Sequence, residues 1–403
     1  MKYTAEDVMM YVNEEDVKFI RLAFCDVFGK PKNISILPGE LPGAFEHGIA
    51  IDATAIDGFG DETYSDMFLH PDPSTLSILP WRPEHGRVVR MYCSITRADG
   101  VPVESDTRSL LIKAVEEAEK EGITFSLGSE MEFYLFNLDD DGKPTKEPYD
   151  YAGYLDIAPE DRGENVRREI CLMLEQMGII PESSHHEEGP GQNEIVFRNS
   201  DPLSAADNAA AFKTVVKTVA GRNGLFADFS PKPLEDKPGN GYHINISVKN
   251  DENNKILTSI LAGIMYHIKD ITAFLNPTVE SYYRFGTYKA PQYISWSKEN
   301  RSQLIRIPAA ADGSVRAELR SPDGLTNPYL AFALLIFAGL EGVKNNYSLP
   351  EKSNMDMYEA GEDAVKNYEK LPQSFKEAKK FALESDFASK YVPGSILNIY
   401  CKQ

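Results

Sequence analysis

The sequence has 403 residues, of which 42% are hydrophobic and 26% are charged, and its formal net charge at pH 7 is −20. This composition is typical of a globular protein, and the length favours two or three domains. The negative charge argues against binding to nucleic acid or to an anionic membrane surface. Because the four cysteines lack a CxxC pair and no apolar stretch reaches the ~20 residues of a membrane span, we expect a cytoplasmic protein.

Short β-prone runs separated by turns fill the first hundred residues, as in the segments 17–26, 34–43, 75–81 and 86–96. Such runs are typical of strands. They predict a small sheet domain with one early helix over residues 1–103. A helix is expected to follow, with Asp106 or Thr107 as its N-cap.

From residue 104 to residue 403 the pattern alternates between helices and strands. Apolar residues at three- and four-residue spacing predict helices that end at Gly122, Gly178 and Gly224. Because strands are expected between these helices, the larger domain is predicted to be of the α+β class.

Three predicted strands carry charged residues opposite their apolar residues. Alternate residues of a strand point to the same side, so Glu130 and Glu132 share one face of the strand 124–136. The corresponding faces of the other two strands carry His243, Asn245 and Ser247, and Arg316, Glu318 and Arg320. Half-buried strands often turn such a face to water. These faces are rich in Glu, His and Arg rather than Lys and Thr, which favours a functional site.

A further acidic group surrounds the Gly-Pro-Gly turn of segment 183–197. It contains His185, His186, Glu187, Glu188 and Glu194. Adjacent histidines are often ordinary surface residues, but a cluster of mutually repelling carboxylates is best stabilised by a cation. Oxygen donors with one or two imidazoles suit Mg²⁺ or Mn²⁺ better than a structural zinc ion.

Arginines are concentrated late in this acidic chain, at Arg284, Arg301, Arg306, Arg316 and Arg320. Arg301 and Arg306 have opposite strand parity, so both reach one site only if the backbone bends between them. Arginines beside a carboxylate–metal site suit phosphoryl transfer, in which they offset the charge of the transferred group. Neither GxxxxGK[ST] nor GxGxxG is present. The residues therefore predict a metal-dependent, ATP-using enzyme without those nucleotide-binding loops.

A series of segments resembles, in order, the motifs of the bacterial type I class of glutamine synthetases. They are SDMFLHPDPST (65–75), GSEMEF (128–133), GYL (153–155), EQMGIIPESSHHEEGPGQNE (175–194), NGYHINIS (240–247), NPTVESYYR (276–284), NRSQLIRIP (300–308), RAELRSPD (316–323) and NPYLAFALLIFAGLEGVKN (327–345). The resemblance implies an N-terminal β-grasp domain and a catalytic domain with a curved, largely antiparallel sheet. It also implies a dodecamer of two hexameric rings, with each active site completed by a neighbouring subunit.

The resemblance further implies the substrates and the roles of single residues. The substrates would be glutamate, ATP and ammonia or an amine, with two or more Mg²⁺ or Mn²⁺ ions per site. The metal ligands would be Glu132, Glu187 and Glu194 for one ion and Glu130, His243 and Glu318 for the other. Glutamate would be bound by Gly239, His243, Arg284 and Arg320, and ATP by Asn245, Ser247, Arg306 and Arg316. Arg301 would stabilise the transferred phosphoryl group, while Tyr154 and a neighbour's Asp52 would shape the ammonium pocket.

One departure from the family pattern concerns the incoming nitrogen. The family's flap reads Tyr-Glu-Ala-Pro, and its Glu helps to deprotonate ammonium, whereas TYKAPQY places Lys289 at that catalytic position. A lysine ammonium neither attracts ammonium nor accepts its proton. Glu280 or another carboxylate would then supply the base, or the acceptor would be a small primary amine. The alternative is a non-catalytic homologue that binds nucleotide or glutamine and regulates a partner.

Overall fold

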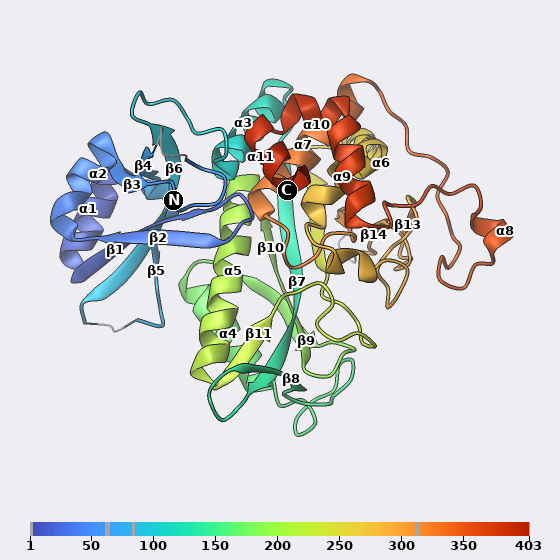
Figure 1. The fold of residues 1–403 in the computed structure, drawn as a ribbon, viewed down its shortest axis with the longest axis horizontal. Helices are drawn as coiled ribbons and strands as arrows, with labels where there is room; N and C mark the ends of the chain where they lie inside the picture. The colour runs from blue at the N-terminus through green and yellow to red at the C-terminus, as the bar shows by residue number, and fades with distance from the viewer. Residues whose placement is uncertain (1–2, 61–64, 83–84, 311–314, 403) are drawn as a thin grey trace.

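The computed structural model describes residues 3–60, 65–82, 85–310 and 315–402. Its first sheet has six strands, in the order β2-β1-β6-β4-β3 with β5 paired to β6. These strands are β1 (Val17–Cys25), β2 (Pro31–Ile36), β3 (Ile49–Asp52), β4 (Asp66–Pro71), β5 (Ser77–Ile78) and β6 (Arg87–Arg97). Helices α1 (Ala5–Glu14) and α2 (Leu41–His47) pack against this sheet, away from the rest of the molecule (Figure 1). The early helix and the small sheet domain are therefore confirmed.

One predicted strand is wrong over most of its length. Segment 34–43 continues β2 only to Ile36 and then forms the 3₁₀ helix η1 (Pro38–Glu40) and the start of α2. Pro38 and Pro42 occupy the first turns of these two helices. Proline suits that position because the first helical N–H groups have no partner within the helix.

The second sheet has nine strands, in the order β13-β14-β15-β12-β7-β10-β9, with β8 and β11 also paired to β7. They are β7 (Phe125–Leu138), β8 (Pro144–Pro148), β9 (Pro181–His186), β10 (Gln192–Ser200), β11 (Leu225–Asp228), β12 (Tyr242–Val248), β13 (Trp296–Lys298), β14 (Ile305–Ile307) and β15 (Ala317–Leu319). Only β13 and β14 pair in parallel among the described strands of this sheet. The largely antiparallel sheet is confirmed.

Helices cover the apolar face of this sheet (Figure 1). They are α3 (Thr107–Lys120), α4 (Glu164–Gln176), α5 (Pro202–Arg222), α6 (Lys255–Leu275), α7 (Pro328–Lys344), α9 (Phe375–Glu384), α10 (Asp386–Tyr391) and α11 (Gly394–Cys401), with the 3₁₀ helix η3 (Glu280–Tyr283). The short helix α8 (Glu362–Val365) lies apart from the sheet (Figure 1), and the 3₁₀ helix η2 (Pro73–Thr75) follows β4. Asp106 is the N-cap of α3, as predicted, and accepts a 3.1 Å hydrogen bond from the backbone N–H of Arg108. α6 and α7 can approach each other closely because Gly263 and Gly342 have no side chains at the crossing. A Cβ on Gly263 would lie only 2.8 Å from the Cα of Gly342.

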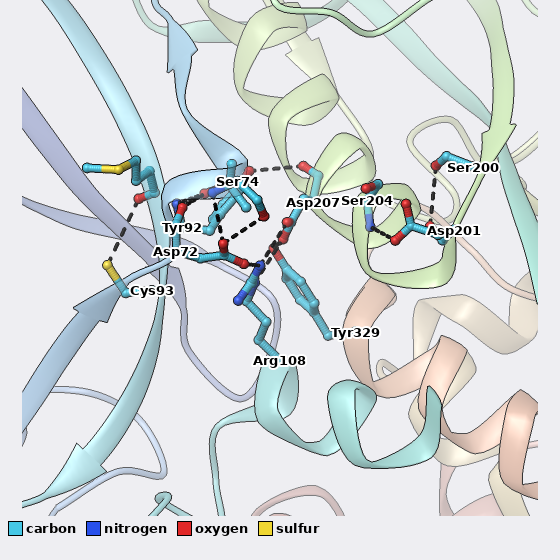
Figure 2. A network of polar contacts seen from close by, with 12 residues as sticks. Asp72, Ser74, Tyr92, Cys93, Arg108, Ser200, Asp201, Ser204, Asp207 and Tyr329 are labelled. Carbon is cyan, nitrogen blue, oxygen red and sulfur yellow. Dashed lines mark hydrogen bonds and ion pairs between the residues drawn. The ribbon is translucent and has the colours of Figure 1, made fainter. Parts of the chain in front are cut away.

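A buried polar network joins the first sheet to the helices of the second (Figure 2). Nη2 of Arg108, on α3, lies 2.9 Å from Oδ2 of Asp72 and 3.2 Å from Oδ2 of Asp207. The hydroxyl of Tyr329, on α7, donates to Oδ1 of Asp207 at 2.7 Å, and the hydroxyl of Tyr92, on β6, donates to its carbonyl at 3.0 Å. Asp72 follows β4 and Asp207 lies on α5, so this network fastens the two parts together. The predicted boundary at residues 103/104 falls between β6 and α3 and stays a prediction.

Candidate active site

A cavity of about 380 Å³ opens beside the strands of the second sheet. Most residues predicted as site residues line it: Glu130, Glu132, Tyr154, Glu187, Glu194, Gly239, His243, Arg284, Lys289, Arg301, Arg306, Arg316 and Arg320. They come from segments far apart in the sequence, and strand pairing brings the central ones together. The cavity is therefore built from several strands of the second sheet and from the loops that connect them.

Strand register places the acidic side chains opposite one another. β7 pairs with β12 so that Glu130 faces His243, and with β10 so that Glu132 faces Glu194. β12 pairs with β15 so that Asn245 faces Glu318. The prediction that Glu130 and Glu132 share a functional face is confirmed by their common position in the cavity lining.

Two groups of side chains at the cavity have the spacing of metal ligands. Ligand atoms of Glu130, Glu194 and His243 lie within 4.8 Å of one another, as do those of His185, Glu187 and Glu194. Glu194 thus belongs to both groups and lies between them. These groups differ from the two predicted sets of ligands. Glu194 takes the place of Glu318 beside Glu130 and His243, and His185 takes the place of Glu132 beside Glu187 and Glu194.

The two remaining predicted ligands flank these groups. Oε2 of Glu132 accepts a 2.6 Å hydrogen bond from the backbone N–H of Gly241. Oε1 of Glu318 lies 3.1 Å from Nδ1 of His243, which is also 3.6 Å from Oε2 of Glu130. Five of the six predicted metal ligands therefore line the cavity, and Glu318 is buried against His243 beside it.

The electrostatics of the carboxylates favour a cation. Glu194 is only 8% exposed, and its burial, together with the nearby Glu130, Glu132 and Glu187, raises its pKa well above the usual value. Burial and the charge of Glu187 also raise the pKa of Glu132. Carboxylates that resist ionisation for these reasons are stabilised as anions by a divalent ion. The donor set of oxygens with two imidazoles fits Mg²⁺ or Mn²⁺.

Glu318 and His243 form the other electrostatic centre of the site. Burial would raise the pKa of Glu318, but Arg320, His243 and Arg306 hold it well below the usual value. Burial and Arg320 would lower the pKa of His243, but its contacts with Glu130 and Glu318 outweigh them and raise it to about 9. The carboxylates around His243 therefore favour a positive charge at this position, which the proton supplies in the absence of a metal ion.

Arg284 and Arg320 are buried cations with unused donors. The Nε atom of each is buried and has no hydrogen-bond partner among the described residues. Nη1 of Arg284 donates to the carbonyl of Ser321 at 3.1 Å. A Cβ on Gly239 would lie 2.6 Å from Cγ of Arg284, so glycine is needed for the guanidinium stem to pass. Unused buried donors of this kind suit a ligand that carries a carboxylate.

The bend required between Arg301 and Arg306 is present. Arg301 lies in the turn segment 301–304, whereas Arg306 lies on β14, which begins at Ile305. Both arginines line the cavity despite their opposite parity. Arg316 lines this cavity and also a second cavity of about 530 Å³, which Ser247 lines as well.

Comparison with known families decides the relationship of this chain. The family model for the glutamine synthetase catalytic domain matches residues 104–403, and the model for the glutamine synthetase beta-Grasp domain matches residues 16–98. The chain belongs to the glutamine synthetase family. The predicted resemblance and the predicted fold class, with an N-terminal β-grasp domain, are thereby confirmed.

The chain is also similar to individual members of the glutamine synthetase family. The chain is 42% identical to a glutamine synthetase of Clostridium saccharobutylicum, over 99% of this chain and 94% of the relative. It is 45% identical to a glutamine synthetase of Methanosarcina mazei, over 93% and 87% of the two chains. The solved structure of GmaS in complex with ADP is similar with a TM-score of 0.88 and 27% identity, over 98% of this chain and 94% of that chain. Every helix in the described part of the chain is too short or too polar to span a membrane.

Besides Glu318, which adjoins His243, and Ser247, which lines the second cavity, two site residues expected from the glutamine synthetase motifs lie outside the lining of this cavity. Nδ2 of Asn245 donates a 2.8 Å hydrogen bond to Oε1 of Glu130 and so supports that carboxylate. Asp52, at the end of β3, accepts hydrogen bonds from the backbone N–H and the hydroxyl of Thr54, at 2.9 and 2.7 Å. It does not line the cavity of its own chain. Their roles in binding ATP and ammonium stay predictions.

A buried network supports the turn that carries Glu187, and the sequence did not reveal it. Nε2 of His186 lies 2.8 Å from Oδ1 of Asp150, and its Nδ1 lies 2.6 Å from the carbonyl of Glu187. Arg167 forms an ion pair with Asp161 and donates to Oδ1 of Asn193 at 2.7 Å. The adjacent histidines thus divide their roles, since His185 lines the cavity and His186 is buried behind it.

Glu188 belongs to the predicted acidic group, but no role of its own was predicted for it. It lines the cavity and forms an ion pair with Lys289, the lysine at the family's flap position. Glu280, the candidate substitute for the missing flap carboxylate, is on the 3₁₀ helix η3 and is not part of the lining. The only signal for Glu188 in the sequence was its place in the acidic run next to Glu187.

Proposed function

We propose that this protein is an ATP-dependent ligase that activates glutamate as γ-glutamyl phosphate and forms a γ-amide with ammonia or a small primary amine. One observation carries this proposal: a single cavity holds a carboxylate cluster, two buried arginines with unused donors, and further arginines beside them. The curated relatives named glutamine synthetase, at 42% and 45% identity, support the same reaction.

Each part of the cavity has a distinct task in this reaction. Arg284 and Arg320 bind the carboxylate of glutamate, because their buried Nε donors have no other partner among the described residues. Arg301 is exposed at the cavity, where its guanidinium stabilises the charge of the transferred phosphoryl group. Arg306 and Arg316 bind the nucleotide phosphates, with Ser247 further along the second cavity. The ADP complex of GmaS supports a nucleotide site in this fold.

The acidic wall holds the metal ions that the family uses. Glu132, Glu187 and Glu194 would bind one ion, and Glu130, His243 and Glu318 the other. An Mg²⁺ or Mn²⁺ ion held there would supply positive charge that offsets the charge developing on the phosphates of ATP. Gln192 orients this wall, because its Nε2 donates to the carbonyl of Gly239 at 3.1 Å and lies 3.4 Å from Oε2 of Glu132.

We further propose that the cytoplasmic enzyme is a double ring of two hexamers. Asp52 is exposed on β3 and lies outside its own cavity, which fits a role in the site of a neighbouring subunit. A non-catalytic role is less well supported, because five predicted metal ligands line the cavity, the sixth, Glu318, contacts His243, and the named relatives are synthetases.

The test is phosphate release from ATP with Mg²⁺ and glutamate, with ammonia and a panel of small primary amines as acceptors. Release that depends on both glutamate and an acceptor is expected, and product analysis by mass spectrometry should identify the γ-amide. Release with ammonia identifies a glutamine synthetase, whereas release with one organic amine alone identifies a γ-glutamylamide synthetase. ATP binding without release under any condition would refute the ligase assignment and favour the non-catalytic alternative.

A further inference from the structure

The side chain of Lys289 is directed into the cavity by an unusual turn. Tyr288 and Lys289 both have left-handed backbone conformations, with φ angles of 46° and 65°. Non-glycine residues rarely adopt this conformation, and two in succession need support from their surroundings. Nη2 of Arg320 supplies such support by donating to the carbonyl of Lys289 at 3.3 Å. The backbone of Lys289 is thus held in place while 47% of its side chain remains exposed.

The Lys289 ammonium lies in a small cage of side chains. Its Nζ forms an ion pair with Oε1 of Glu188 and lies 5.6 Å from the centre of the Tyr154 ring. The Tyr154 ring meets the ring of His185 edge-on, with 5.4 Å between the ring centres. The backbone N–H of Glu188 donates to Oε2 of Glu187 at 3.0 Å, which places the cage next to the carboxylate wall.

A carboxylate and an aromatic face together form a receptor for a primary ammonium group. The carboxylate supplies a charge-assisted hydrogen bond, and the ring supplies a cation–π contact. Lysine carries the same ammonium group as methylamine or ethylamine, at the end of a flexible stem. The cage therefore has the chemistry of an acceptor site and already contains an ammonium group of the protein itself.

We propose that Glu188 adds a carboxylate to the ammonium pocket expected at Tyr154, so that this subsite holds ammonium or a small primary alkylammonium ion, and that Lys289 occupies the subsite as a tethered competitor. The inference rests on the proposed function, because the subsite is that of the second substrate. The acceptor displaces the lysine side chain while the backbone of the turn stays fixed to Arg320. Lys289 then sets the acceptor concentration that the enzyme needs, and Glu188 is a specificity-determining residue.

Kinetics of Lys289→Met test the competition. A tethered ion pair of this exposure, with its cation–π contact, corresponds to about a fivefold effect, so the KM for the acceptor should fall about fivefold. The KM values for glutamate and ATP should stay unchanged. Adding Glu188→Gln to this variant should raise the acceptor KM again by about fivefold, because the carboxylate of the subsite is lost. An unchanged or higher acceptor KM in Lys289→Met would overturn the inference.

Lys232→Met is the matched control for charge. Nζ of Lys232 lies 4.7 Å from the centre of the Tyr288 ring and donates to the carbonyl of Lys237 at 2.5 Å. The substitution removes one positive charge near the turn of Tyr288 and Lys289, but Lys232 forms no ion pair with a carboxylate of the described residues. The acceptor KM should therefore stay at its wild-type value. An equal fall in both lysine variants would mean that general charge, rather than occupancy of the subsite, controls the acceptor.

A second readout does not depend on turnover. Lysine acetylation by a low dose of acetic anhydride, followed by peptide mass spectrometry, reports how accessible Lys289 is relative to Lys232. Methylammonium chloride should increase the labelling of Lys289, whereas sodium chloride at the same ionic strength should not. Equal labelling in both salts would overturn the inference. Increased labelling without phosphate release in any assay would keep the subsite and refute the ligase reaction, so the two failures are distinguishable.

Discussion

Replacing Arg108 by methionine should destabilise the protein strongly, because it leaves carboxylates buried without their cation. Arg108 is 3% exposed and pairs with Asp72 and Asp207, whose side chains are 26% and 9% exposed. Removing one partner of a buried ion pair typically costs about 3–5 kcal/mol. Asp207 accounts for most of this cost, since Asp72 is partly hydrated and also accepts hydrogen bonds from Ser74.

The cost should be partly reversible by a second change. Asp207→Asn removes the buried charge while its side chain still accepts from the Tyr329 hydroxyl. The double variant Arg108→Met/Asp207→Asn should therefore regain roughly half of the lost free energy of unfolding. Double-variant coupling of this kind separates an unpaired charge from a simple loss of packing.

Urea unfolding followed by far-UV circular dichroism measures both effects. All variants should be compared at one subunit concentration, because assembly shifts the apparent stability. Lys18→Met is the control, since its ion pair with Asp16 is exposed on both sides and its loss should leave the midpoint unchanged. A wild-type midpoint for Arg108→Met would refute the reasoning that this network holds the two sheets together.

Four further predictions concern the cavity. Glu318→Ala should reduce phosphate release by at least about a hundredfold, because Arg306, Arg320 and His243 lose their common partner; wild-type release would contradict its proposed role as a metal ligand. Arg284→Gln should raise the KM for glutamate at least about thirtyfold, the usual effect of removing a buried charge that binds an anion, and an unchanged KM would place glutamate elsewhere. The pKa of His243 is raised to about 9, so metal binding must displace its proton, and affinity for Mn²⁺ by calorimetry should rise up to about tenfold per unit between pH 7 and 9. In the metal-free protein, the protonated His243 should also stabilise the fold. This contribution is complete below about pH 6.5 and is lost as the pH rises through about 9.

Much of the site was predictable because strands have a strict period of two. That period placed Glu130 and Glu132 on one face without any knowledge of the fold. Parity assigns a face, however, and not a neighbour. Asn245 shares the parity of His243, yet its side chain bonds to Glu130 instead of lining the cavity. Its place depends on the register between β7 and β12, which no single strand contains.

Contacts between distant loops were not predictable at all. Lys289 and Glu188 are 101 residues apart and lie on turns that have no period. Short helices after prolines were also missed, as in segment 34–43, because β-prone residues continue into α2. Local composition describes such a segment poorly when its conformation is set by packing against β1 and β4.

The network around Arg108 has a mechanical consequence for the proposed ring. Asp52, the acid proposed to reach the neighbouring subunit, pairs with Asp66 at the start of β4, and Asp72 directly follows the end of β4. Strands β3 and β4 thus form a short arm between Asp52 and Asp72. The base of this arm is clamped to α3 and α5 of the same chain. In the proposed ring, a movement of α3 or α5 in one subunit would be passed along this arm to Asp52 in the neighbouring site. Two adjacent sites would then influence each other without any contact between their ligands.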